Sequence, residues 1–282
     1  MDTTAVNAKD VMRLRERTGL GMMDCKAALA EAGGDMAKAE AILKERLKGK
    51  MDTRTDRAAG QGRIAIRIDG AAGSQRAAIV EMRAETDFTA KNDEFVAMAD
   101  AVAAIAAKDA SGDVTVTPAM TARIDEIRLK TGENVSFGRG VAAAGAFFGS
   151  YVHHDGKLGV LLETSAAIPA DVALGICQHI AANVPTPMAI GEADMPKDLV
   201  EARRREAVEE AKASGKPAEI AEKMAQGKMR KFFEDHTLLG QKFVKDEKKS
   251  VRELLPSGVS VVRFIRMPLG GDAVHAKAPG AR

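Results

Sequence analysis

The sequence predicts an α+β protein with an N-terminal three-helix bundle, a core of two related hairpin-plus-helix subdomains with antiparallel sheets, and a projecting antiparallel helical hairpin. Three observations lead to this prediction. Helical periodicity with capping residues fills the first fifty residues. Strand-type alternation then occurs in two copies, each followed by a helix, and a long segment of charged residues and alanine follows the second copy.

The first fifty residues carry the signals of three short helices. Asn7 can cap the first helix and Asp35 the third, while the second is predicted over Met23 to Ala32. Glycines follow the first two helices, as is typical of helix C-termini. Residues 48–62 are polar, contain glycine and have no apolar period, so they predict a linker.

A strand pattern starts where the helical period ends. The stretch RIAIRID at 63–69 alternates isoleucine with other residues, which predicts a half-buried strand. Ala-Ala-Gly-Ser at 71–74 predicts a turn, and the returning strand covers Gln75 to Ala84. A helix is expected from about Asp93, with Phe95 and later apolar residues on one face.

The same unit recurs later in the chain. Phe147 to His154 and Lys157 to Thr164 predict a second hairpin, closed by Asp-Gly, and a helix is expected over Asp171 to Val184. Where the first copy has Asp87-Phe88 after its hairpin, the second copy has Ser165-Ala166. The repeated fold therefore does not require an aromatic residue at this position.

A segment of charged residues and alanine follows the second copy. Helices are predicted over Lys197 to Ala213 and Ala218 to Asp235, with a Ser-Gly-Lys-Pro turn between them. Because the apolar face is too narrow for a globular core, we expect a projecting antiparallel hairpin. Its predicted seam is formed by Leu199, Val208, Ile220 and Met224. A last strand is expected over Val259 to Met267, followed by a mobile polar tail.

These elements predict three parts of the chain. We expect the bundle and its linker in residues 1–54 and a first core subdomain in residues 55–140. A second core subdomain is expected in residues 141–282, with the helical hairpin as an insert at about 194–236.

Composition and charge argue against several classes of function. The 282 residues carry 42 Lys and Arg against 40 Asp and Glu, a formal charge of +2, so the overall charge does not demand a nucleic acid or an anionic membrane. Every apolar stretch is shorter than the ~20 residues of a membrane span, and the first ten residues lack the apolar region of a signal peptide. We therefore predict a cytoplasmic protein with no membrane or direct nucleic-acid partner.

Sequence motifs for a cofactor are also missing. Neither GxxxxGK followed by Ser or Thr, nor GxGxxG after a strand, occurs in the chain, so we expect no bound nucleotide. Cys25 and Cys177 lie far apart on apolar helical faces, which suits small buried hydrophobes in a reducing compartment. We expect no cofactor and no metal.

The stretch ETDFTAKNDEF, at 85–95, places an aromatic residue among polar ones. Phe88 lies between the end of a strand and the start of a helix, and two interpretations of it are equally supported. It can fold back into the core as a loop residue, or it can stand exposed and fill a pocket of a partner protein. Large aromatic residues are more often buried, and the polar flanks together with the alanine in the second copy make exposure equally well supported.

Two further positions each allow a functional interpretation beside a structural one. Met22 and Met23 follow Gly-Leu-Gly in the predicted turn between the first two helices, where one of them could fill the bundle and the other contact a partner. His153 and His154 could be metal ligands. Because adjacent strand residues point to opposite faces, surface or interface histidines are the favoured interpretation.

Several long motifs, in the same order, resemble one known family. These motifs are LRERTGLGMMDCKAAL at 14–29, ETDFTAKNDEF at 85–95, GSYVHHDGKLGVLLE at 149–163, KPAEIAEKMAQGKMRKFF at 216–233 and FVKDEKKSVRELL at 243–255. Together they are similar to bacterial elongation factor Ts, the guanine-nucleotide exchange factor of elongation factor Tu. The likeness covers nearly the whole chain, and its first motif resembles a ubiquitin-associated (UBA) type of helical domain.

The resemblance implies an exchange factor that is not itself an enzyme. Its TDF loop, here Thr86 to Thr89, would insert Phe88 and the neighbouring Asp87 into the GTPase domain of Tu, disturb the Mg²⁺ site and release GDP. The residues implied to contact Tu elsewhere are Arg15, Met22, Met23 and His153. The partner would be Tu in its GDP-bound and nucleotide-free forms, and the resemblance allows a complex with two copies of each protein.

One departure and two alternatives accompany this interpretation. Thr89 replaces the valine that usually follows TDF in this family, which would trim apolar area at the contact. The chain could instead be an adaptor that binds peptides or ubiquitin-like partners through Met22 and Met23. A metal-dependent hydrolase using His153 and His154 is a third hypothesis.

Overall fold

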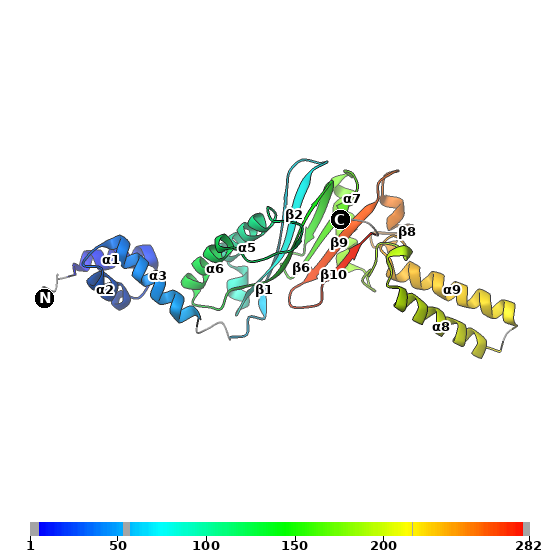
Figure 1. Ribbon diagram of the computed structural model, residues 1–282, viewed down its shortest axis with the longest axis horizontal. Helices are drawn as coiled ribbons and strands as arrows, with labels where there is room; N and C mark the ends of the chain where they lie inside the picture. The colour runs from blue at the N-terminus through cyan, green and yellow to red at the C-terminus, as the bar shows by residue number, and fades with distance from the viewer. Residues whose placement is uncertain (1–5, 53–56, 216, 279–282) are drawn as a thin grey trace. The chain divides into compact units, whose positions relative to one another are not determined.

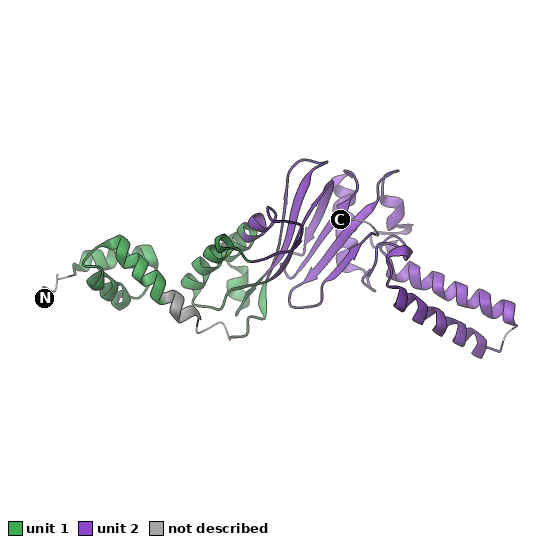
Figure 2. Ribbon diagram, viewed as in Figure 1, with its two compact units in different colours: residues 1–62, 82–101, 116–138 green, residues 63–81, 102–115, 139–282 purple. Residues whose placement is uncertain are grey.

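The computed structural model describes residues 6–52, 57–215 and 217–278, leaving out the side chains of 47–52. It confirms the α+β class, with helices and antiparallel strands throughout (Figure 1). The chain forms two compact units (Figure 2): unit 1 comprises residues 1–62, 82–101 and 116–138, and unit 2 comprises residues 63–81, 102–115 and 139–282. The subdomain boundaries at 54/55 and 140/141 stay predictions.

The first part of unit 1 is the predicted three-helix bundle. Its helices are α1 (Ala8–Thr18), α2 (Met22–Glu31) and α3 (Met36–Asp52). Asn7 caps α1 by accepting a hydrogen bond from the backbone of Lys9, and Asp35 accepts one from Lys38 at the start of α3. The core of the bundle is formed by Val11, Leu14, Cys25, Ala28, Leu29, Ala39 and Leu43.

The predicted linker is wrong at its start. The last helix of the bundle, α3, continues to Asp52, and β1 begins at Gln61, so helix and strand occupy both ends of the stretch 48–62. The reason is that lysine and methionine are good helix formers and extend a helix without an apolar period, even across the single Gly49. Residues 53–56 lie outside the part of the chain that the structure describes.

The first hairpin and its helix follow as predicted. Strand β1 (Gln61–Asp69) and strand β2 (Gln75–Ala84) flank the expected turn, and α5 (Asp93–Ala106) starts at the expected residue. Between β2 and α5 lies a short helix, α4 (Asp87–Lys91), where a loop was expected. Residues 118–131, to which no element was assigned from the sequence, form α6 (Pro118–Thr131), with Thr117 as N-cap and Gly132 in a left-handed conformation at its end.

The strands form two four-stranded sheets that pack face to face through residues of unit 2. The first sheet has the order β1–β2–β4–β3, with β3 (Gly112–Asp113) and β4 (Ser136–Gly145). The second has the order β10–β9–β6–β5, with β5 (Phe147–Val152), β6 (Leu158–Thr164), β9 (Val261–Pro268) and β10 (Val274–Lys277). One apolar cluster joins the inner faces: Ile64, Ala77, Ile79, Val141, Ala143, Phe148, Leu161, Ile265 and Met267.

Close sheet packing explains one glycine of the second sheet. A Cβ atom at Gly159 would lie 2.4 Å from Cγ2 of Ile64, so a larger residue would push the two sheets apart. The other face of the second sheet packs against α7 (Ala170–Ala182), through a cluster that includes Val160, Leu162, Ile176, Ile180 and Phe264. The order β5, β6, α7 confirms the predicted second copy of hairpin plus helix.

The charged segment forms the predicted helical hairpin. Helix α8 (Lys197–Ala213) and helix α9 (Ala218–His236) run side by side (Figure 1), after a 3₁₀ turn at Glu192–Asp194. The predicted seam is confirmed in part: Val208 and Met224 pack against the contact, whereas Leu199 lies outside it and Ile220 is exposed. The buried residues of the contact are Ala207, Ala211, Ala221, Ala225 and Met229. Alanine offers little apolar area but lets two helix axes approach closely, so small side chains form the contact.

The C-terminal segment is more ordered than expected. After β7 (Lys242–Phe243), β8 (Asp246–Ser250) and a 3₁₀ turn at Val251–Leu254, β9 completes the second sheet. The predicted mobile tail instead turns back as β10, which pairs antiparallel to β9 in the register Val274 with Arg266. Ala276 is buried by this pairing. No helix of the described part of the chain is long and apolar enough to span a membrane.

Candidate functional site

The candidate site is the short helix α4, which carries Phe88. Thr86 caps it: its extended backbone precedes the helix, and its hydroxyl oxygen accepts a hydrogen bond of 3.3 Å from the backbone N–H of Thr89. The N–H of Ala90 bonds to the carbonyl of Thr86 at 3.2 Å, and Asn92 ends the helix. The TDF motif therefore forms a capped helical turn rather than a loop.

The turn divides its side chains into an inner and an outer set. Thr89 and Ala90 are buried, with 7% and 6% of their surface exposed, while Phe88 is 84% exposed. Of the two interpretations of Phe88 that the sequence left open, the exposed one agrees with the structure. Thr89, expected at the contact surface, faces inward instead, because a helical turn points successive side chains about 100° apart.

A second segment of unit 1 holds the residues that precede the turn. Glu133, which follows α6, accepts two hydrogen bonds from Thr86: one from the backbone N–H at 3.1 Å and one from the hydroxyl at 2.6 Å. Glu85 in turn accepts a bond of 2.6 Å from the backbone N–H of Asn134. The two segments, 85–86 and 133–134, are thus joined by three hydrogen bonds to carboxylates, which are stronger than neutral ones.

Further contacts extend this brace within unit 1. The side-chain amide of Asn134 donates to the carbonyl of Arg57 at 2.8 Å, and the guanidinium of Arg57 lies 3.6 Å from Glu85. Lys130 of α6 pairs with Glu94 in the first turn of α5 at 2.7 Å. We name the set Arg57, Glu85, Thr86, Glu133 and Asn134 the brace. It fixes the entry to the turn independently of Phe88.

The polar side chains beside Phe88 are arranged for exposure. Asp87 and Lys91 form an ion pair of 2.8 Å along one face of the turn, with 45% and 68% of the side chains exposed. Asn92 caps α5 by accepting a bond of 2.8 Å from the backbone of Glu94. Phe88 is therefore an exposed apolar side chain on a helical turn whose other exposed side chains are polar.

The second copy of the unit ends differently after its hairpin. Thr164, which matches Thr86 in sequence, donates its hydroxyl to the carbonyl of Ala166 at 2.7 Å, only two residues away. Residues 165–169 form no helix. The same threonine position thus closes a local turn in one copy and joins a distant segment in the other.

The bundle presents the predicted residues Arg15, Met22 and Met23 on its surface. Arg15 is exposed on α1, and Met22 and Met23 are 50% and 75% exposed. Both methionines lie in the first turn of α2, not in the turn before it, and neither fills the core. Met12 of α1, 51% exposed, was missed, although its place beside the buried Val11 on an amphipathic helix predicts this exposure.

His153 lies at the end of β5 in unit 2. Its Nδ1 atom is 2.8 Å from the hydroxyl of Tyr151, and its ring centroid is 4.3 Å from that of His154. The expectation that the two imidazoles point to opposite faces is wrong, because β5 ends at Val152 and the chain turns there. In the described residues, no group of three or more His, Cys, Asp or Glu is placed to hold a metal ion.

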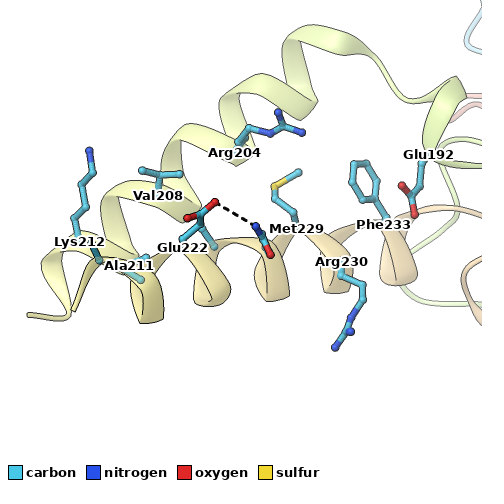
Figure 3. A pocket seen from close by; sticks show the side chains of 13 residues that line it. Glu192, Arg204, Val208, Ala211, Lys212, Glu222, Met229, Arg230 and Phe233 are labelled. Atoms are coloured by element: carbon cyan, nitrogen blue, oxygen red, sulfur yellow. Dashed lines mark hydrogen bonds between the residues drawn. The ribbon is translucent and has the colours of Figure 1, made fainter. Parts of the chain in front are cut away.

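A groove of about 710 Å³ lies between α8 and α9 (Figure 3). Its walls include Val208, Ala211, Met229 and Phe233, and Gln226 donates to Glu222 at its rim at 3.4 Å. The groove is lined by apolar and charged helix side chains and contains none of the predicted site residues.

Comparisons with known proteins agree with this fold class. The family model described as elongation factor TS matches residues 85–271, a range that starts at Glu85 of the brace. A protein of Thioalkalivibrio sulfidiphilus described as elongation factor Ts is 40% identical over 98% of this chain and 99% of its own length. Proteins with the same description from Thiobacillus denitrificans and Methylococcus capsulatus are 40% and 41% identical over 96% and 94% of this chain, and over 94% and 92% of their own lengths.

An α+β fold with an exposed aromatic on a braced turn, taken with these matches, defines a translation elongation factor that acts in protein biosynthesis. More narrowly, the chain belongs to the elongation factor Ts family.

Proposed function

We propose that this chain binds elongation factor Tu in its GDP-bound and nucleotide-free forms and promotes the release of GDP, without catalysing a chemical reaction itself. One observation carries the proposal: Phe88 is 84% exposed on a helical turn whose entry is held by the brace. An aromatic side chain that is both exposed and held in a fixed direction can fill a pocket of a partner and carry much of the binding energy.

The proposed mechanism is negative coupling between the binding of this chain to Tu and the binding of GDP to Tu. Phe88 enters an apolar pocket of the GTPase domain, and Asp87 follows it toward the Mg²⁺ site. Mg²⁺ compensates the charge of the GDP phosphates, so a shift of the Mg²⁺ ligands weakens the binding of GDP to Tu. By linkage, a protein that binds nucleotide-free Tu more tightly than Tu·GDP must weaken GDP binding by the same factor.

The brace supports this role by preorganisation. Because Glu133 and Glu85 fix the residues before the turn, little conformational entropy is lost when Phe88 docks. The capped turn also sets the direction of the Phe88 side chain, which a flexible loop of the same sequence would not do. The ion pair between Asp87 and Lys91 is exposed and salt-screened, so this pair contributes little to the stability of the turn.

We infer further contacts at Arg15, Met22 and Met23 of the bundle and at His153 of unit 2. Methionine side chains adapt to irregular apolar surfaces, which suits exposed docking residues such as Met22 and Met23. Contacts at several places along the chain would raise the effective concentration of the turn at its pocket. We further infer action in the cytoplasm, and a complex with two copies of each protein is one stoichiometry that light scattering of the mixture would detect.

The decisive experiment measures the release of a fluorescent GDP from elongation factor Tu at saturating concentrations of this chain. Phe88→Ala is expected to slow stimulated release at least about tenfold, since hot-spot aromatics carry ~2 kcal/mol or more. Its free energy of unfolding should change by less than about 0.5 kcal/mol, because the side chain is exposed. Ile220→Ala removes another exposed apolar residue and is the matched control, with wild-type release expected. Undiminished release by Phe88→Ala would contradict the proposal.

A further inference from the structure

The methionines of the chain are distributed unevenly between surface and interior. Among the described residues, those with the greatest exposure are Met12 at 51%, Met22 at 50%, Met23 at 75% and Met188 at 41%. Six others are buried: Met82, Met98, Met120, Met195, Met229 and Met267. Three of the four exposed methionines thus belong to the small bundle of α1, α2 and α3.

The exposed methionines of the bundle contribute nothing to its core. The buried cluster of the bundle consists of aliphatic residues and Cys25, with Met36 partly buried against it, and Met12, Met22 and Met23 are outside it. A change in polarity at Met22 or Met23 would therefore alter the surface of the bundle without opening its core. Their place in the first turn of α2 also leaves the helical hydrogen bonds intact.

The thiols of the chain are shielded from oxidants, unlike these thioethers. Cys25 is fully buried, with its sulfur near the hydroxyl of Thr18 and the carbonyl of Leu20. Cys177 is also buried, and burial raises the pKa of its thiol far above the usual range, which suppresses the reactive thiolate. Oxidants therefore meet exposed methionine sulfur first, because the susceptibility of sulfur follows its exposure.

We propose that Met22 and Met23 form an oxidation site, where hydroperoxides convert the thioethers to sulfoxides and so weaken docking of the bundle on elongation factor Tu. The effect on docking rests on the function proposed above. In each reaction the sulfur attacks a peroxide oxygen, an S–O bond forms as the O–O bond breaks, sulfur loses two electrons, and hydrogen peroxide is reduced to water. The product side chain is polar where the thioether was apolar.

The site responds to oxidants in a reversible way. Sulfoxide reductases restore the thioether, so the modified chain is not lost. Because the buried methionines are protected by packing, mild oxidation changes binding and not folding. Two adjacent methionines also give a graded response, since one sulfoxide removes part of the apolar contact and two remove most of it.

The test treats the full chain with graded hydrogen peroxide, removes the oxidant with catalase, and maps sulfoxides by mass spectrometry of peptides. We expect sulfoxide at Met22 and Met23 at doses that leave Met82, Met98 and Met120 intact, with an unchanged circular dichroism spectrum. The Kd for Tu·GDP, measured on the same samples, should rise about tenfold for each methionine buried at the contact. Treatment with methionine sulfoxide reductases A and B should restore it.

Variants separate this inference from the proposed function. The double variant Met22→Leu with Met23→Leu keeps an apolar surface without the oxidisable sulfur atoms, so its Kd for Tu·GDP, compared before and after peroxide, should not change. Met188→Leu removes an exposed methionine of unit 2 and should stay as sensitive as the wild type. Equal oxidation of buried methionines, or undiminished sensitivity of the double variant, would overturn the inference. An untreated chain that fails to bind Tu would overturn the proposed function, and with it the effect on docking, while the sulfoxide map still decides the oxidation site.

Discussion

Both hydrogen-bond donors of Thr86, its backbone N–H and its hydroxyl, reach the carboxylate of Glu133, at 3.1 and 2.6 Å. The two residues are 47 positions apart in the chain, and both belong to unit 1. This contact connects the end of α6 to the entry of α4. It makes the orientation of Phe88 depend on a residue that does not itself belong to the turn.

Glu133→Ala should therefore reduce both stability and exchange. In this variant the backbone N–H and the hydroxyl of Thr86 both lose their charged acceptor. We therefore expect the free energy of unfolding to fall by about 1–2 kcal/mol. GDP release from Tu should slow even at saturating concentrations of the chain, because the turn is less well oriented. Glu126→Ala, which removes an exposed acid of α6, is the control and should behave as the wild type. Normal release by Glu133→Ala would limit the brace to a structural role.

Thr89→Val restores the apolar residue that the family resemblance leads one to expect. Because Thr89 is buried against the chain, the change should not alter the surface that meets Tu. We expect GDP release within about twofold of the wild type and a free energy of unfolding that is equal or higher by up to ~1 kcal/mol, since burying a hydroxyl is costly. A clear gain in the affinity for Tu would instead show that the position contacts the partner.

His179 predicts a dependence of stability on pH. The imidazole is fully buried; Val244 donates its N–H to Nδ1 at 3.1 Å, and Nε2 lies 3.0 Å from the carbonyl oxygen of the Gln241 side chain. The Gln241 amide donates to the carbonyls of Pro185 and Asp235, so its oxygen must accept from Nε2–H. The neutral ring satisfies all of these bonds, whereas the protonated ring would set a second N–H against that of Val244.

Burial lowers the pKa of His179, and the bond to Gln241 only partly opposes this shift. The unfolded chain, with an ordinary pKa near ~6.5, therefore binds more protons than the folded chain. The contribution of His179 to the free energy of unfolding should be complete above pH ~6.5. It should decrease as the pH falls below ~6.5 toward the lowered pKa of the folded state. Denaturant unfolding between pH 5 and pH 8 measures this, and His179→Gln should flatten the profile while the exposed His154→Gln leaves it unchanged. A profile unaffected by His179→Gln would assign the dependence to other groups.

The alanine seam of the hairpin predicts intolerance to larger side chains. Ala207 is 5% exposed between α8 and α9, and Ala207→Leu should destabilise the hairpin by about 1–3 kcal/mol through overpacking. Hydrogen exchange of the amides of α8 and α9 measures this loss locally. Ala202→Leu, on the exposed side of α8, is the control. Equal protection in both variants would show that the helices can move apart without cost.

Local patterns predicted the elements whose signals are local. The strand over Gln75 to Ala84 and the helix start at Asp93 agree with the structure because a turn sequence and a capping residue mark them. Helix α6 has comparable signals, Thr117 before Pro118 and Gly132 at its end, and could have been predicted from them.

Other features depend on contacts that the sequence order does not show. Five residues are too few for a helical period, so α4 could not be recognised in ETDFTAKNDEF. The residue that holds its N-cap, Glu133, is distant in the sequence. Strand β10 exists because β9 offers it an edge, and its four residues carry no clear alternation. The exposure of Phe88 was predicted only as one of two equal interpretations, since polar neighbours surround buried and exposed aromatics alike.

The two threonines that end the paired hairpins also bear on how such a site can originate. Thr164 is satisfied by a carbonyl two residues away, so that copy is self-contained and leaves its neighbours little scope for change. Thr86 is satisfied by Glu133, which lies outside its own hairpin-plus-helix unit, and of the residues that follow, Thr89 and Ala90 pack inward while Phe88 stays exposed. Duplication of a hairpin-plus-helix module would then give two copies with different constraints. In one copy local contacts fix the turn, and in the other a single residue, Phe88, is constrained only by its contact with the partner.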